Sequence, residues 1–256
     1  MTVLQQISIA CPLIFLAGFV DSVAGGGGLI SLPAYYLTGM TSHFAIGSNK
    51  FSSCIGTVFS TARFFRSGSI YIWPASTAAV FALLGSYIGA KSALLLDDYF
   101  LRIAMLFMLP IAAVVILSQG KKKNQDKSTF SQIPFRKAII LCGIIGFVLG
   151  MYDGFFGPGT GTFLILAFTS ILGFDTKTAC GNTKVVNLAS NIAALAAFIT
   201  AGKVQYAVAA PAALCSVAGH WLGSGLAIKK GAKFIRPFMV FVLIMLFVKV
   251  GLDILV

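Results

Sequence analysis

Residues 16–39 read LAGFVDSVAGGGGLISLPAYYLTG and carry a carboxylate, Asp21, followed by four consecutive glycines in an otherwise apolar run. Consecutive glycines interrupt a helix because they add backbone freedom that the helix must freeze. The stretch from Leu4 to Gly39 is also too long for one transmembrane helix of about 20 residues. We therefore expect two helical arms joined by a glycine turn, which form either a re-entrant hairpin or two full spans.

The composition places this stretch in a membrane. Of the 256 residues, 58% are hydrophobic and only 10% are charged, whereas a soluble globular protein carries about 25% charged residues. Several apolar runs are long enough to cross a lipid bilayer, so the sequence predicts an all-α polytopic membrane protein. The formal net charge of +12 arises from Lys and Arg in short loops between the apolar runs. That distribution is typical of cytoplasmic loops and argues against binding to nucleic acid.

The N-terminus and the cysteines argue against other classes. No basic segment precedes the first apolar run, which favours a first span over a cleaved signal peptide. The five cysteines occur singly, and the two histidines, His43 and His220, lie far apart. This spacing predicts neither a disulfide framework nor a metal site, and no motif predicts a cofactor. We expect both histidines to be packing residues.

An internal repeat divides the chain. GSNKF at 47–51 corresponds to GNTKV at 181–185. Asp21 and its glycine turn correspond to Asp153 and the turn FFGPGTGT at 155–162. Glycines of the later spans follow in the same order, because Gly85 and Gly89 fall on Gly219 and Gly223.

Each repeat is expected to hold a glycine-interrupted helical hairpin and three transmembrane helices, about eight to ten membrane segments in all. The repeats are residues 1–118 and 137–256 of one integral membrane domain, and a basic linker at 119–136 joins them. The expected helices are 4–20, 29–39, 44–66, 70–93 and 99–118, then 137–151, 159–173, 179–200, 204–228 and 234–255. An odd number of crossings in each repeat inverts the second one. With the linker in the cytoplasm, most Lys and Arg face the cytoplasm and both termini lie outside.

The glycine turns are the first part of the candidate site. Irregular backbone at membrane depth is tolerated only where protein buries it or where it lines a wet cavity. The short helices that begin near Leu29 and Thr160 would point free N–H groups and positive dipole ends into that cavity, which suits an anion. The alternative is that the glycines only form tight turns and allow close helix packing. The candidates are Gly25, Gly26, Gly27, Gly28, Gly157, Gly159, Thr160 and Gly161.

The starts of the spans that follow the hairpins are the second part. Each supplies hydroxyl or amide groups and one cation, which a polyoxygen anion needs when it leaves water. The alternatives are that the lysines snorkel to the interface and that Ser48 and Asn182 cap their helices. The candidates are Ser48, Asn49, Lys50, Asn182, Thr183 and Lys184. A polar stripe that either holds helices together or contacts the substrate continues with Ser52, Ser53, Thr57, Asn187, Ser190 and Asn191.

The two aspartates of the hairpins allow more than one role. Asp21 and Asp153 would repel an anion unless they were protonated or paired with a cation. Each could carry a coupling proton, pair with Lys50 or Lys184, or cap the broken helix. We favour the structural roles over proton coupling.

At these residues the chain resembles the sulfite exporter TauE/SafE family of membrane permeases. The similarity is carried by DSVAGGGGLISLPAYYLTGM and AIGSNKFSS in the first repeat, and by GFFGPGTGTFLI and ACGNTKVVNLASN in the second. It implies a permease of the cytoplasmic (inner) membrane that moves a small sulfur-containing anion, such as sulfite, sulfoacetate or another organosulfonate, without ATP. It also implies a binding site at the glycine turns, Asn49, Lys50, Thr183 and Lys184.

The leading interpretation is thus a secondary transporter that works by alternating access at a central site between the repeats. A proton-coupled permease for another small organic anion, such as a carboxylate, is the alternative, and a membrane enzyme or scaffold is a remote one. The chain contains neither HExxH nor GxSxG, and its glycine run lacks the Gly-Lys-Ser/Thr ending of a P-loop. The direction of transport, the coupling ion and a homodimeric state are left open by the sequence.

Overall fold

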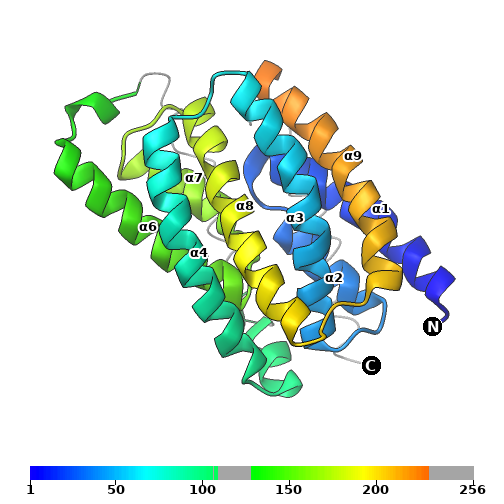
Figure 1. The fold of residues 1–256 in the computed structure, drawn as a ribbon. Helices are drawn as coiled ribbons and strands as arrows, with labels where there is room; N and C mark the ends of the chain where they lie inside the picture. Colours follow the sequence, from blue (N-terminus) through cyan, green and yellow to red (C-terminus); the bar gives the residue numbers. More distant parts are fainter. Residues whose placement is uncertain (106, 109–127, 231–256) are drawn as a thin grey trace.

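The computed structural model describes residues 1–105, 107–108 and 128–230, and every regular element in this part of the chain is helical (Figure 1). This confirms the predicted all-α class for these residues. The elements are α1 (Val3–Ala24), α2 (Gly28–Leu37), α3 (Ser42–Arg66), α4 (Ile72–Leu94), the short 3₁₀ helix η2 (Phe130–Gln132), α6 (Phe135–Phe155), α7 (Thr160–Ser170), α8 (Thr176–Thr200) and α9 (Tyr206–Lys230).

Each helix that the sequence predicts within the described residues is present. The main differences from the predicted helix bounds occur at the hairpin turns. α1 continues past residue 20 to Ala24, because the first residue in a left-handed conformation is Gly25 (φ 73°), whose N–H bonds to the carbonyl of Asp21. The expected span 234–255 lies outside the described residues, as do most of the span 99–118 and the first half of the linker 119–136.

Both hairpins pair one long helix with one short helix. α1 and α6 have 22 and 21 residues and are apolar enough to cross a membrane. α2 and α7 have 10 and 11 residues, so at 1.5 Å per residue they extend only about half of a hydrocarbon core that is roughly 30 Å thick. The second arm of each hairpin is therefore too short to be a full span.

The chain is a multi-pass membrane protein, as its long apolar helices and outer surface indicate. α1, α4, α6 and α8 are long and apolar enough to span a membrane. Large apolar side chains remain exposed on outward faces, among them Leu84 on α4, Ile140 on α6 and Leu214 on α9. In a bilayer such faces contact lipid, so they need no protein partner. α3 is as long as the spans but carries a buried polar side, including Ser48, Asn49 and Lys50.

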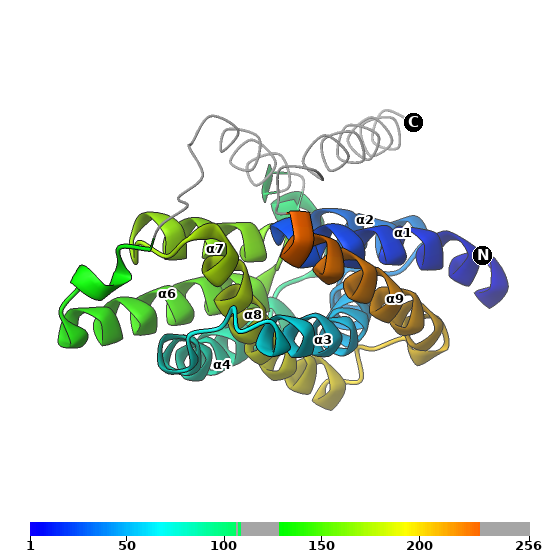
Figure 2. The same ribbon diagram turned by 90° about the horizontal axis from the view of Figure 1, so that it is seen from above.

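The long arm of each hairpin packs against a helix from the other half of the chain. α1 lies along α9, and α6 lies along α4, while α3 and α8 contact each other in the centre. Figure 2 shows the α6–α7 hairpin on one side and the α1–α2 hairpin on the other. Glycines make both crossings close: a Cβ on Gly85 would strike the α6 backbone at Phe147, and one on Gly219 would strike the α1 backbone at Phe15.

Candidate functional site

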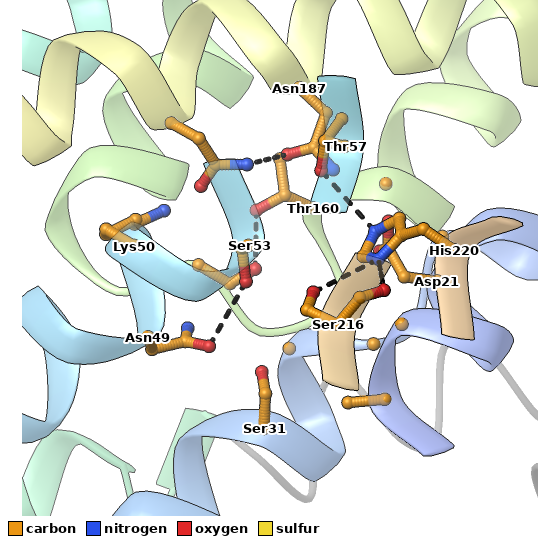
Figure 3. Close-up of a pocket in the computed structure, with 18 of the residues that line it drawn as sticks. Asp21, Ser31, Asn49, Lys50, Ser53, Thr57, Thr160, Asn187, Ser216 and His220 are labelled. Atoms are coloured by element: carbon orange, nitrogen blue, oxygen red, sulfur yellow. Dashed lines mark hydrogen bonds and ion pairs between the residues drawn. The ribbon is translucent and has the colours of Figure 1, made fainter. Parts of the chain in front are cut away.

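A cavity with about 460 Å³ of empty space, which includes its opening, lies where the two hairpin turns meet the polar sides of α3, α8 and α9 (Figure 3). Most of the candidate residues from the sequence line it. These are Asp21, Gly25, Gly27, Gly28, Asn49, Lys50, Ser53, Thr57, Asp153, Gly157, Thr160, Gly161, Asn187 and Asn191.

The two glycine turns touch each other at the cavity. Gly25 and Gly161 approach so closely that a Cβ on either one would overlap the backbone of the other. The Thr162 hydroxyl donates a hydrogen bond of 2.8 Å to the carbonyl of Ala24 and so ties the turns together. Positive φ angles at Gly25, Gly157 and Gly159 allow these turns, and other residues seldom adopt that conformation.

The N-termini of α2 and α7 therefore converge on one cavity. Neither has a side-chain cap, because the N-cap positions are glycines, Gly27 and Gly159. The first turn of a helix carries N–H groups without intrahelical partners and a positive end of the dipole. Two such ends in one cavity form a favourable environment for negative charge.

Two crossed ion pairs flank the cavity. Asp21 of α1 pairs with Lys184 of α8 at 2.6 Å, and Asp153 of α6 pairs with Lys50 of α3 at 2.8 Å. The four side chains are almost fully buried. The Ser190 hydroxyl donates a further hydrogen bond of 2.6 Å to Asp153. Each carboxylate is thus compensated by a cation, which removes the repulsion that it would otherwise exert on an anion.

Lys50 is the ammonium group that lines the cavity. Its Nζ lies beside the turn at Gly157, close to where a Cβ on that glycine would lie. An ammonium group has three N–H donors, and Asp153 is its partner in the described part of the chain. Two donors therefore remain for a ligand.

Several candidates do not reach the cavity lining, namely Gly26, Ser48, Ser52, Gly159, Asn182, Thr183, Lys184 and Ser190. Ser48 and Asn182 instead accept hydrogen bonds of 3.0 Å from the backbone N–H groups of Gln205 and Tyr71. Gln205 and Tyr71 directly precede α9 and α4. The two polar side chains therefore cap the start of the following helix rather than their own helix. Lys184 lies behind Asp21, and its Nζ also donates to the backbone carbonyl of Asp21.

Three polar lining residues were not selected as site candidates from the sequence: Ser31, Ser216 and His220. His220 corrects the expectation of a packing residue, because its Nε2 lies 3.4 Å from Asp21 Oδ2 and its Nδ1 lies 2.9 Å from the carbonyl oxygen of Ser216. The available signal was the position of an ionisable side chain inside an apolar helix, which marks a functional candidate by default.

Ser31 is the second addition of note. Its side chain is buried in the first turn of α2, and its Oγ has no hydrogen-bond partner among the described residues. Figure 3 places Ser31 at the cavity, below Asn49 and Ser53. A buried hydroxyl without a partner costs about 1–3 kcal/mol, so a ligand that bonds to Ser31 would regain that energy.

The cavity does not resemble a metal centre. No group of three His, Cys, Asp or Glu side chains that could hold a metal comes together within residues 1–105, 107–108 and 128–230. The polar atoms at the cavity are mostly hydroxyl, amide and ammonium groups, which donate hydrogen bonds to an anion.

Known proteins resemble this chain over most of its length. Residues 10–250 match the family described as "Sulfite exporter TauE/SafE". A "Probable membrane transporter protein ORF9" of Sinorhizobium sp is 34% identical over 93% of this chain and 90% of its own length. The "Probable membrane transporter protein YfcA" of Escherichia coli K12 is 36% identical over 89% of this chain and 82% of its own length. No solved structure matches the chain.

Proposed function

Because this chain belongs to the TauE/SafE family of membrane transporters and is not an enzyme, we propose that it is a secondary transporter for a small sulfur-containing anion. Sulfite, sulfoacetate and other organosulfonates are the substrates considered. The family description names sulfite export, which supports this class of ligand. The observation that carries the proposal is the convergence of two uncapped helix N-termini on a cavity that Lys50 also lines.

The groups around the cavity match the needs of an oxyanion. Sulfite and sulfonates carry three oxygens on one sulfur, and each oxygen requires donors when it leaves water. Gly28 at the start of α2 and Gly161 at the start of α7 supply backbone N–H groups that have no acceptor among the described residues. Lys50 supplies an ammonium, and Ser31 supplies a hydroxyl without another partner among these residues. The glycines let ligand oxygens approach the backbone, since no Cβ intervenes.

The contacts between the halves support two inverted repeats, residues 1–118 and 137–256. Asp21 with Lys184 corresponds to Asp153 with Lys50 when the two halves exchange roles. The caps from Ser48 to Gln205 and from Asn182 to Tyr71 correspond in the same way, as do the glycine crossings of α4 on α6 and of α9 on α1. A two-fold axis in the membrane plane produces such exchanged pairs of contacts. Alternating access would then come from gating of one repeat against the other around this cavity.

The distribution of charged and aromatic residues supports a cytoplasmic linker with both termini outside. α3 ends with Arg63 and Arg66. α6 begins at the same end of the molecule, where the Trp73 ring packs at a tilt against Phe130 and Phe135 (Figure 1). Aromatic side chains gather at membrane interfaces, and Lys and Arg gather on the cytoplasmic side.

The proposal is tested by counterflow in proteoliposomes that contain the purified protein. We expect radiolabelled sulfite or a sulfonate to accumulate against an unlabelled internal pool, and acetate and malonate to compete weakly. The variant Lys50→Gln with Asp153→Asn removes both members of one ion pair, so it leaves no uncompensated buried charge. It is expected to fold and to lose counterflow.

Lys91→Gln is the matched control, because Lys91 is an exposed lysine at the end of α4. It should transport like the wild type. Stronger counterflow with carboxylates than with any sulfur anion would instead favour the carboxylate permease. Normal counterflow in the Lys50/Asp153 double variant would refute the assignment of the site.

A further inference from the structure

We propose that His220 takes up the proton that accompanies the anion into the cavity. This inference rests on the proposed function and adds to it a coupling group and a stoichiometry. His220 lies on α9 with 2% of its surface exposed and lines the cavity beside Asp21. Figure 3 shows its ring between Ser216, Thr57 and Asp21.

The hydrogen bonds of the ring identify the nitrogen that would receive an added proton. Nδ1 lies 2.9 Å from the backbone carbonyl oxygen of Ser216 and 3.2 Å from the Ser216 hydroxyl oxygen, and the carbonyl oxygen is the nearer partner. A carbonyl oxygen only accepts hydrogen bonds, so Nδ1 carries a hydrogen and donates it. Nε2 is therefore the nitrogen that is bare in the neutral ring and protonated in the imidazolium.

Nε2 faces two oxygen atoms, one from a carboxylate and one from a hydroxyl group. It lies 3.4 Å from Asp21 Oδ2 and 3.5 Å from Thr57 Oγ1. In the neutral ring, Nε2 and the carboxylate oxygen are both acceptors and cannot bond, so Thr57 is the available donor. In the imidazolium, Nε2–H donates to Asp21, and charge-assisted bonds of this type shorten to about 2.7–2.9 Å.

Two glycines hold the ring in this place. A Cβ on Gly18 of α1 or on Gly56 of α3 would collide with Nδ1 or Cε1 of the ring. The ring therefore occupies a slot between α1 and α3 that only the absence of side chains creates. The slot fixes the direction of Nε2 toward Asp21.

The charged side chains around the cavity sum to zero, so one added proton would give the cavity a net positive charge. α1 contributes Asp21, α8 contributes Lys184, α6 contributes Asp153 and α3 contributes Lys50. Arg63 of α3 contacts the next residue of α9, at the Trp221 carbonyl, on the exposed side. The two carboxylates and the two ammonium groups cancel, so the cavity is neutral while His220 is neutral. A protonated His220 gives it one positive charge, which balances one monoanion.

Only the second repeat has a histidine at this position. When the two repeats are aligned so that Gly85 matches Gly219, Ser86 of the first repeat matches His220 of the second. Ser86 donates a hydrogen bond of 2.6 Å to the carbonyl of Ser190, and Asp153 receives its second bond from the Ser190 hydroxyl. One ion pair thus has a titratable neighbour and its counterpart has a serine. This asymmetry predicts one proton for each anion.

Calorimetry on the detergent-purified wild type tests the stoichiometry without any variant. Methanesulfonate is the probe, because its charge is constant over the range of about pH 5–8 in which histidine titrates. Titration near neutral pH in two buffers of different ionisation enthalpy gives the number of protons taken up with the anion. We expect net uptake that approaches one proton and at least tenfold tighter binding at about pH 5.5 than at about pH 8. Binding without proton uptake would overturn the inference.

Proteoliposomes test the residue. Anion entry should carry protons that an enclosed pH-sensitive dye detects, and an inward proton gradient should stimulate uptake several-fold. His220→Gln should lose the dye signal and the stimulation, and the anion concentration that its counterflow requires should rise and should no longer depend on pH. His220→Lys, with a permanent charge, should bind methanesulfonate with an affinity that does not change with pH. The matched control Ser86→Ala should remain proton-stimulated.

The outcomes separate the two claims. Proton-coupled uptake that persists in His220→Gln would refute the role of His220 and leave the transporter assignment intact. A wild type that moves sulfur anions without protons would do the same. A wild type that transports none of the sulfur anions would refute the proposed function itself.

Discussion

Replacing Ser31 by alanine is a perturbation for which the structure predicts opposite effects on stability and on binding. The Ser31 hydroxyl is buried, lines the cavity and has no partner among the described residues. Its removal therefore breaks no hydrogen bond and removes a desolvated polar group that costs about 1–3 kcal/mol. Ser31→Ala should unfold at the same temperature as the wild type or at a higher one.

The expected effect on binding is a loss. If the hydroxyl donates to a bound anion, the variant loses a hydrogen bond to a charged group, which is worth about 1.5–3 kcal/mol. At about 1.4 kcal/mol for each factor of ten, this corresponds to a roughly 10- to 150-fold weaker Kd. Calorimetric titration with methanesulfonate at constant pH measures the change.

Ser86→Ala is the matched control for this experiment. Ser86 is also a fully buried serine, but its hydroxyl donates 2.6 Å to the carbonyl of Ser190 and does not line the cavity. Its removal should lower stability by about 1 kcal/mol and leave the Kd unchanged. The reasoning would be refuted if Ser31→Ala destabilised the protein while it kept wild-type affinity, since the hydroxyl would then have a structural partner and no ligand.

Three further predictions concern the elements that build the cavity. Lys184→Met should destabilise the protein by about 3–5 kcal/mol because it leaves Asp21 buried without its cation, and Asp21→Asn combined with Lys184→Gln should recover most of the loss in a thermal unfolding assay. Gly161→Val should abolish folded protein in size-exclusion chromatography, since any Cβ there overlaps the backbone of Gly25. Gly219→Leu should separate α9 from α1 at Phe15 and lower the unfolding temperature more than Leu214→Ala, which trims an exposed side chain. A Gly219→Leu protein as stable as Leu214→Ala would contradict the close crossing.

The positions of the helices could be predicted from the sequence because they depend on local signals. The apolar runs and the glycine turns predicted the bounds of α1, α2, α6 and α7 to within a few residues. This is because a glycine with positive φ commonly ends a helix. The residues at the turns, such as Gly25, Gly28 and Gly161, could be placed at the cavity for the same reason.

The partners of the polar side chains could not be predicted in the same way, because they come from the other half of the chain. Asp21 lies far in sequence from Lys184 and closer to Lys50, and only the crossed packing of α1 and α8 decides which lysine it meets. Ser48 and Asn182 were expected at the site, yet the next helix turns its unpaired N–H groups toward them. His220 looked like a packing residue because the glycine slot that holds it is formed by Gly18 and Gly56 of two other helices.

The central claim is that the cavity between the N-termini of α2 and α7 binds a sulfur oxyanion. Selenite has the shape and charge of sulfite and contains an anomalous scatterer, so crystals grown with selenite would locate the anion directly. The account predicts an anomalous peak for a selenite whose oxygens lie within hydrogen-bonding distance of Lys50 and the Ser31 hydroxyl, beside the backbone of Gly28 and Gly161. A peak elsewhere in the membrane-embedded part, with this cavity empty, would contradict it.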